Sequence, residues 1–158
     1  MKLGITGHRG LHGETEKVVR RAISAAVAAY DPDELVGVSC LAEGPDVWFA
    51  EAVLDHGGRI EVMLPADECR TELPEWHLPV YDDLLSRASD VRSTGLREVT
   101  DEAHMAGSEL LVDRVDELIA VWDGLPARGH GGTADVVAYA ESHDVPVRNL
   151  WPTGHVRD

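Results

Sequence analysis

Short apolar runs alternate with segments of helical periodicity along most of the sequence, and this alternation constrains the fold more than any other feature. Runs such as LGIT at 3–6 and LIAVW at 118–122 are typical of strands. Apolar residues recur at helical spacing in segments such as 14–30. We expect strands at 3–6, 35–39, 59–64, 90–97, 118–122 and 145–150, and helices at 14–30, 45–56, 78–88, 101–113 and 133–143.

Strands that alternate with helices indicate βαβ units and a parallel sheet. The apolar runs are nearly continuous, as expected for strands that are covered on both sides. A chain of 158 residues suits one domain. The sequence therefore predicts an α/β fold: a single Rossmann-like domain over residues 1–158, with a mostly parallel sheet and helices on both faces. Ligands of such sheets bind outside the carboxyl ends of the strands.

The excess of acidic over basic residues limits which partners the chain can bind. The chain has 29 acidic and 14 basic residues, with a formal net charge of -15. Phosphate neutralisation by a nucleic-acid binder needs a basic face, and an anionic membrane attracts basic segments. We therefore expect no nucleic-acid partner and no membrane attachment, although a local basic pocket is compatible with this balance.

The cysteines and the N-terminus bear on the compartment. Cys40 and Cys69 make neither a disulfide framework nor a four-ligand zinc site. The first residues lack the pattern of a signal peptide, and no apolar run is long enough to cross a bilayer. We expect a cytoplasmic protein with both thiols reduced.

The loop after the first expected strand contains Gly7, His8, Arg9 and Gly10. Glycines let a backbone approach an anion closely, and a following helix N-terminus favours negative charge. The Arg9 guanidinium can hold a phosphate with two parallel hydrogen bonds, and His8 can donate another. The alternative is a simple turn with an exposed Arg and a His that caps it locally.

The loop after the second expected strand contains Glu43 and Gly44 and leads into a helix at Pro45 and Asp46. An acidic residue beyond the second strand often holds ribose hydroxyls in Rossmann-like folds. Glu43 and Asp46 are both candidates for this role. The alternative for Asp46 is a structural one, because the helix dipole alone favours an acid in the first turn.

The loop after the fifth expected strand begins at Asp123 and Gly124 and reaches Gly131, Gly132 and Thr133, which opens a helix. Such a glycine-rich loop can hold a phosphate against the helix N-terminus. Thr133 has an alternative role as a helix N-cap, and the two roles are compatible. Together with the first loop, this one predicts a site for a nucleotide or a phosphosugar.

The same residues carry a family resemblance. The blocks GITGHRGL, SCLAEGPDVWFAEAVL, VMLPADE, VDELIAVWDG and GHGGTADVVAYA follow one another as in the Rossmann-like SLOG (Smf/DprA–"lonely guy") superfamily. The chain resembles its small, stand-alone bacterial branch of YpsA-like and YspA-like proteins. The resemblance implies a pocket for a nucleoside monophosphate, an NAD derivative or ADP-ribose.

Several members of that superfamily cut the N-glycosidic bond of a nucleoside 5'-monophosphate and share a P-G-G-x-G-T-x-x-E motif. Here Gly132 and Thr133 match its Gly-Thr pair, whereas Val136 stands at its Glu position. A valine cannot stabilise an oxocarbenium ion or transfer a proton. If this chain is a hydrolase, its catalytic carboxylate is then one of three candidates: Glu43, Asp46 or Asp135.

Three functions follow from these patterns. The first is a nucleotide-binding module, and the second is a nucleotide N-glycosidase that releases the base and ribose 5-phosphate. The third is an interaction protein with a vestigial pocket, in which Trp76, Tyr81 and Trp151 would form a partner surface. The resemblance is compatible with a homodimer. No pattern indicates a metal site or a resident cofactor, and a Mg²⁺ ion carried by ligand phosphates leaves no trace in a sequence.

Overall fold

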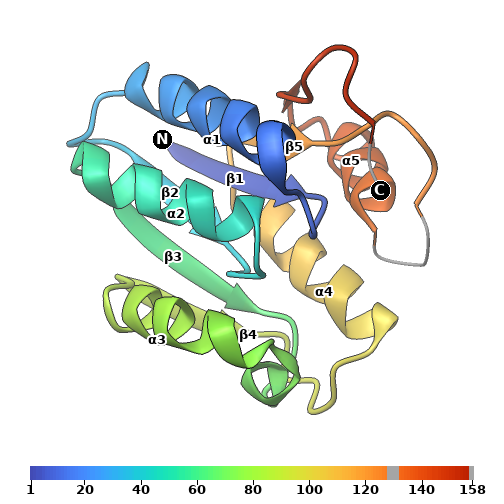
Figure 1. Cartoon of the computed structure of the whole chain (residues 1–158). Helices are drawn as coiled ribbons and strands as arrows, with labels where there is room; N and C mark the ends of the chain where they lie inside the picture. Colours follow the sequence, from blue (N-terminus) through green and yellow to red (C-terminus); the bar gives the residue numbers. More distant parts are fainter. Residues whose placement is uncertain (128–131, 157–158) are drawn as a thin grey trace.

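The computed structural model describes residues 1–127 and 132–156, which form a three-layer α/β domain (Figure 1). The strands are β1 (Lys2–Gly7), β2 (Val36–Ser39), β3 (Arg59–Leu64), β4 (Asp90–Ser93), β5 (Glu117–Val121) and β6 (Val147–Asn149). The helices are α1 (Gly13–Ala28), α2 (Pro45–His56), α3 (Leu78–Ser86), α4 (Asp101–Val112) and α5 (Thr133–Ser142), with short 3-10 turns at Cys69–Glu72 and Glu75–His77.

The sheet has six strands in the order β4-β3-β2-β1-β5-β6, and every neighbouring pair is parallel. From β1 the chain first builds outward through β2, β3 and β4, and then returns to the other side of β1 with β5 and β6. The predicted α/β class and parallel sheet are confirmed. The topological switch point therefore lies between β1 and β5.

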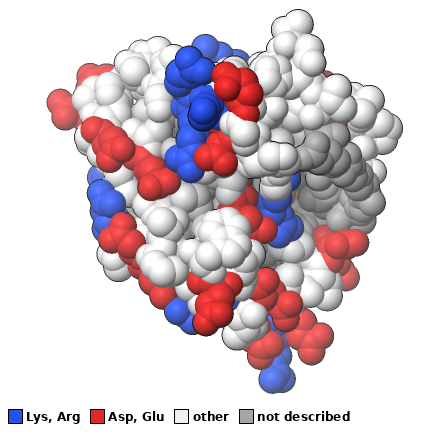
Figure 2. All heavy atoms as spheres, in the orientation of Figure 1, with Lys and Arg blue, Asp and Glu red and all other residues white. Residues whose placement is uncertain are grey.

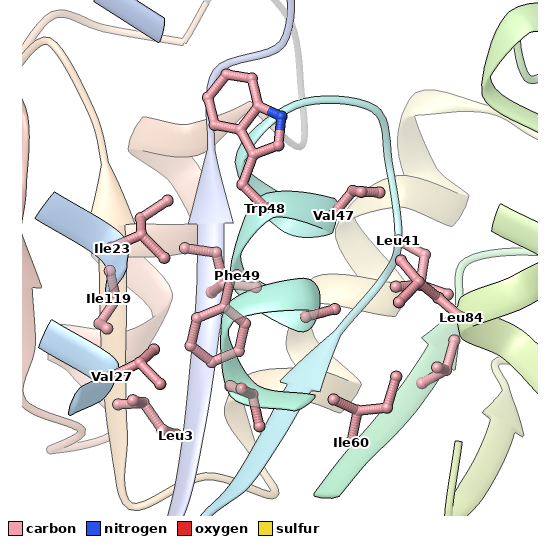
Figure 3. Close-up of a cluster of buried hydrophobic side chains, with 14 of the residues drawn as sticks. Leu3, Ile23, Val27, Leu41, Val47, Trp48, Phe49, Ile60, Leu84 and Ile119 are labelled. Carbon is pink, nitrogen blue, oxygen red and sulfur yellow. The ribbon is translucent and has the colours of Figure 1, made fainter. Parts of the chain in front are cut away.

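Side chains alternate across β1 and separate the two halves of the core. Leu3 and Ile5 are buried on the face covered by α1 and α2, where Ile23 and Phe49 pack with them (Figure 3). Gly4 faces the opposite side, where a Cβ atom would lie 2.7 Å from Leu111 of α4. A second cluster of buried side chains fills this opposite face of the sheet. It contains Val38, Met63, Met105, Leu111, Val112, Val115, Leu118, Val136 and Ala140.

The expected bounds hold for α2 and β3, whereas several other elements are shorter than expected, among them α1, β6 and β4. Helix α1 ends at Ala28 because Tyr30 turns away, and its hydroxyl donates to Glu117 at 2.9 Å. Strand β6 begins at Val147 because the backbone N–H of Val145 still donates to Ala140 of α5. Strand β4 ends at Ser93, whose hydroxyl donates to Asp67 at 2.6 Å as the chain leaves the sheet.

No helix within residues 1–127 and 132–156 combines the length and the hydrophobicity that a bilayer crossing demands.

Candidate functional site

A cavity of about 450 Å³ lies at the carboxyl edge of the sheet, where the chain reverses its direction of growth. This is the position at which open α/β sheets bind ligands. Its volume is within the range of small-molecule sites. The described residues that line it are Ile5, Thr6, Gly7, His8, Arg9, Cys40, Ala42, Asp46, Pro65, Cys69, Glu72, Leu73, Tyr81, Val99, Asp101, His104, Ser108, Ala127, Gly132 and Thr133.

His8 joins the first loop to the loop after β5. Its backbone N–H donates to the carbonyl of Val121 at 3.1 Å, which extends the pairing of β1 with β5. Its Nε2 atom accepts from the backbone N–H of Asp123 at 3.0 Å, and its ring meets Trp151 edge-on. The residue as a whole is 5% exposed. His8 therefore lines the cavity and at the same time holds two of its loops together.

Arg9 projects from the same loop and pairs with Glu43. The Nη1 atom of Arg9 lies 3.4 Å from Oε1 of Glu43, and nearly half of the Arg9 side chain stays exposed. The other Glu43 oxygen, Oε2, is buried and has no hydrogen-bond partner among the described residues. The pair leaves the guanidinium available to a ligand, because one long hydrogen bond uses little of its capacity.

Asp46 lies in the first turn of α2, directly after Pro45 at the helix start. Its Oδ2 atom accepts from the backbone N–H of Ala42 at 3.3 Å. Burial raises the pKa of Asp46 to about 7; the Ala42 hydrogen bond and Arg9 oppose this shift, and Glu43 reinforces it. The carboxyl group therefore exchanges a proton near neutral pH and lines the cavity without a full negative charge.

A strained loop holds Glu43 and Asp46 in place. Leu41 is fully buried and has a φ of 57°, a backbone conformation that non-glycine residues rarely adopt. Its N–H donates to Oγ of Ser39 at 3.0 Å, and its carbonyl accepts from Nε2 of His77 at 2.9 Å. Strain of this kind persists where surrounding contacts fix it, and it is frequent at functional sites.

Helix α4 contributes residues to the cavity that the sequence analysis did not name. Asp101, His104 and Ser108 share one face of the helix and line the cavity. Burial lowers the pKa of His104, and so does the charge of Arg9, while Asp101 and Glu43 act in the opposite direction. The spacing of these three residues is a usable signal once α4 is known to begin at the carboxyl edge of the sheet.

The start of α5 reaches the cavity through Gly132 and Thr133. Gly132 occupies the N-cap position, so Thr133 is the first helical residue and not the cap. The Thr133 side chain is buried and faces the cavity. The first backbone N–H groups of a helix have no intrahelical acceptor, so this end of α5 offers donors to an anion. Gly131 lies outside the described residues.

The remaining candidates do not line the cavity. Gly10 and Gly44 supply left-handed turns, with φ values of 78° and 101°, and Gly44 also caps α2. Asp123 accepts from the N–H of Leu125 at 3.0 Å, and Gly124 completes that turn. Glu43 reaches the site only through Arg9, and Asp135 lies in the first turn of α5 outside the lining. All of these assignments stay predictions.

Val136, which replaces the glutamate of the hydrolase motif, is 1% exposed. It packs with Leu111 and Leu118 between α5 and the sheet. This position therefore belongs to the hydrophobic core and not to the cavity.

Neither thiol is in a disulfide, and both Cys40 and Cys69 line the cavity. Cys69 is buried and lies 3.4 Å from the hydroxyl of Tyr81. Burial raises the pKa of the Cys40 thiol well above its usual value. Among residues 1–127 and 132–156, no group of three or more His, Cys, Asp or Glu side chains is arranged to hold a metal ion.

No family model matches the sequence, and neither does any curated protein. Solved structures do match. DNA processing protein A (DprA) from Streptococcus pneumoniae is 18% identical, with a TM-score of 0.65 over 94% of this chain. DNA processing protein A from Helicobacter pylori is 16% identical, with a TM-score of 0.68 over 94% of this chain. The Moco carrier protein of Chlamydomonas rheinhardtii is 16% identical, with a TM-score of 0.52 over 94% of this chain.

The fold and the position of the cavity define a Rossmann-like α/β domain of the type found in these proteins. The fold that the resemblance to the Smf/DprA–"lonely guy" superfamily implies is confirmed, because these structures share it. This chain spans 49% of the Streptococcus structure, 64% of the Helicobacter structure and 74% of the Moco carrier protein.

The expectation of no nucleic-acid partner is contradicted by this comparison. The Helicobacter structure concerns the single-stranded DNA binding mode of its protein, and that protein has the fold of this chain. The net charge was a poor guide because it sums the whole surface. Basic side chains gather locally here: α1 carries Lys17, Arg20 and Arg21, and Figure 2 shows basic groups over this helix with acidic groups around them.

Proposed function

We propose that this chain binds a nucleotide or a nucleotide-derived ligand, such as a nucleoside monophosphate, an NAD derivative or ADP-ribose, in the cavity at the switch point. One observation carries the proposal: the start of α5 and the Arg9 side chain converge on one cavity of about 450 Å³. Backbone donors at Thr133 and a guanidinium at Arg9 are the groups that hold a phosphate.

The acidic residues of the cavity are compatible with an anionic ligand. Asp46 is about half ionised at neutral pH and mostly protonated below it, because its pKa is about 7. Glu43 already faces Arg9, and a phosphate would compete with it for the guanidinium. A Mg²⁺ ion carried by the ligand would meet the carboxyl groups of Asp46 and Asp101 on the cavity wall.

A thermal-shift panel tests the proposal with AMP, CMP, GMP, UMP, ADP-ribose, NAD and ribose 5-phosphate. A ligand present at a hundredfold excess over its Kd stabilises the folded state by about 2.7 kcal/mol. We expect at least one nucleotide to raise the Tm of the wild type and to raise it less for Arg9→Ala. Arg59→Ala is the matched control, because Arg59 is exposed at the amino edge of the sheet.

A short single-stranded oligonucleotide belongs in the same panel, because a nucleic acid presents the same phosphate, sugar and base. If only the oligonucleotide raised the Tm, the ligand would be a nucleic acid and not a free nucleotide. No shift with any ligand would contradict the proposal and favour an interaction protein with a vestigial pocket.

Hydrolysis of the N-glycosidic bond is the second candidate function, and the state of Asp46 favours it. A carboxyl group with a pKa of about 7 can give a proton to a departing base at neutral pH. Glu43 does not line the cavity, so its carboxylate would stabilise positive charge on the sugar only from its position behind Arg9. Chromatography of the panel mixtures tests it: base release that is lost in Asp46→Asn and Glu43→Gln supports hydrolysis, and no release from any nucleotide contradicts it.

A further inference from the structure

We infer that the part of the cavity beside β3 is a subsite for the planar aromatic base of the ligand. The inference rests on the proposed nucleotide site, and it adds the direction in which the nucleotide lies. Its phosphate would be at the start of α5 and its base beside α3.

The extent of the cavity is the first argument. Its walls include Thr133 at the start of α5, Arg9 beyond β1, Asp46 beyond β2 and Pro65 beyond β3. These elements follow the strand order β5, β1, β2, β3 across the sheet. Neighbouring strands are about 4.8 Å apart, so the cavity spans about 14 Å. A phosphate bound at one end therefore leaves room for a sugar and a base.

The two ends of the cavity also differ in chemistry. The α5 end is polar, with Arg9 and Thr133 in its wall. The β3 end has an apolar wall formed by Pro65, Leu73 and Val99, together with the ring of Tyr81. The Tyr81 side chain is 2% exposed, and its hydroxyl is already paired with the thiol of Cys69. This end therefore offers a flat ring an apolar surface, with the Glu72 carboxylate next to Leu73 as a polar neighbour.

Polar side chains along the cavity wall also exclude an acyl chain as the ligand. Asp46 lies beyond β2, between the two ends, and His104 and Ser108 of α4 also line the cavity. An acyl chain needs a continuous apolar channel, because it cannot satisfy buried polar groups. A ribose can, since its hydroxyls both donate and accept hydrogen bonds. The order phosphate, sugar, base thus matches the order of the wall.

Calorimetric titration of each nucleoside monophosphate and of ribose 5-phosphate tests the inference, because these ligands differ only by the base. We expect the wild type to bind at least one nucleotide about tenfold or more tightly than ribose 5-phosphate. Leu73→Asp should abolish this difference and leave the affinity for ribose 5-phosphate unchanged. Val99→Asp places the same charge on the wall from another segment and should give the same result.

Val80→Asp is the control, because Val80 is exposed on α3 and does not line the cavity. It should preserve the difference between the nucleotide and ribose 5-phosphate. Equal affinities for the two ligands in the wild type would overturn the inference and leave the proposed function intact. A loss of ribose 5-phosphate binding in both wall variants would also overturn it. Binding of neither ligand by the wild type would contradict the proposed function itself, and the inference with it.

Discussion

The Nε2 atom of His8 lies 3.0 Å from the backbone nitrogen of Asp123 and 3.2 Å from its Oδ1 atom. This contact joins the loop after β1 to the loop after β5 across the switch point. Both side chains are almost fully removed from solvent, with 4% and 8% of their surface exposed. The two loops that line the polar end of the cavity are therefore coupled through one imidazole.

We predict that His8→Ala destabilises the fold and weakens ligand binding together. The substitution removes a buried hydrogen-bond acceptor and the edge contact with Trp151, which we expect to cost about 1–3 kcal/mol. Urea unfolding measures the loss of stability, and Lys17→Ala, at an exposed position of α1, is the control. An unchanged midpoint for His8→Ala would show that the contact contributes nothing to the fold.

Asp46 should make stability depend on pH in the opposite sense to a salt-bridged carboxylate. Its pKa in the folded protein is raised to about 7, so the folded state favours the protonated form. The stabilisation is present below the pKa of the unfolded chain, near 4, and is lost as the pH rises through 7. At about 1.4 kcal/mol per pKa unit, the loss reaches about 4 kcal/mol at most.

Asp46→Asn isolates this effect because an amide resembles the neutral acid and does not titrate. We expect the variant to gain stability over the wild type progressively between about pH 4 and pH 7 in urea unfolding, and the difference to level off above pH 7. A stability difference that stays constant over this range would mean that Asp46 does not titrate there.

Glu43→Gln should strengthen the binding of a phosphate ligand. The change removes a negative charge beside Arg9, and an interaction of about 1 kcal/mol corresponds to roughly fivefold in Kd. Calorimetric titration with ribose 5-phosphate measures the change. Weaker binding by the variant would show instead that Glu43 holds the ligand or positions Arg9 for it.

Val136→Glu introduces the glutamate of the hydrolase motif at its expected position, but it should not introduce hydrolase activity. The side chain is in the core between α5 and the sheet, where an unpaired carboxylate costs several kcal/mol. We expect a large fall in Tm, whereas Val136→Ile should be tolerated better because it stays apolar. A stable Val136→Glu protein that releases base from a nucleotide would contradict this assignment.

The local sequence predicts the layers of this fold well. Helix α2 begins at Pro45 and ends before Gly57, whose φ of 100° suits a glycine beyond a helix end. The apolar runs of β1, β3 and β5 also mark strands that are covered on both faces.

The cavity was harder to predict, because its walls come from segments that are far apart in the sequence. Gly7, His8, Arg9, Asp46, Gly132 and Thr133 could be named from strand ends alone, and all of them line it. His104 could not, because nothing local shows that α4 starts at the carboxyl edge and faces Arg9. The left-handed backbone conformation of Leu41 could not be predicted either, because a hydrogen bond from His77, which is distant in the sequence, helps to hold it.

The most direct test of the central claim is a titration of ¹⁵N-labelled protein with ribose 5-phosphate, followed by the backbone amide signals. A phosphate at the switch point should shift the amides of Arg9, Gly132 and Thr133 and leave those of Lys2 and Arg59, at the amino edge, unchanged. A saturable titration confined to the first group would support the site. Absent shifts, or shifts confined to the amino edge, would contradict it.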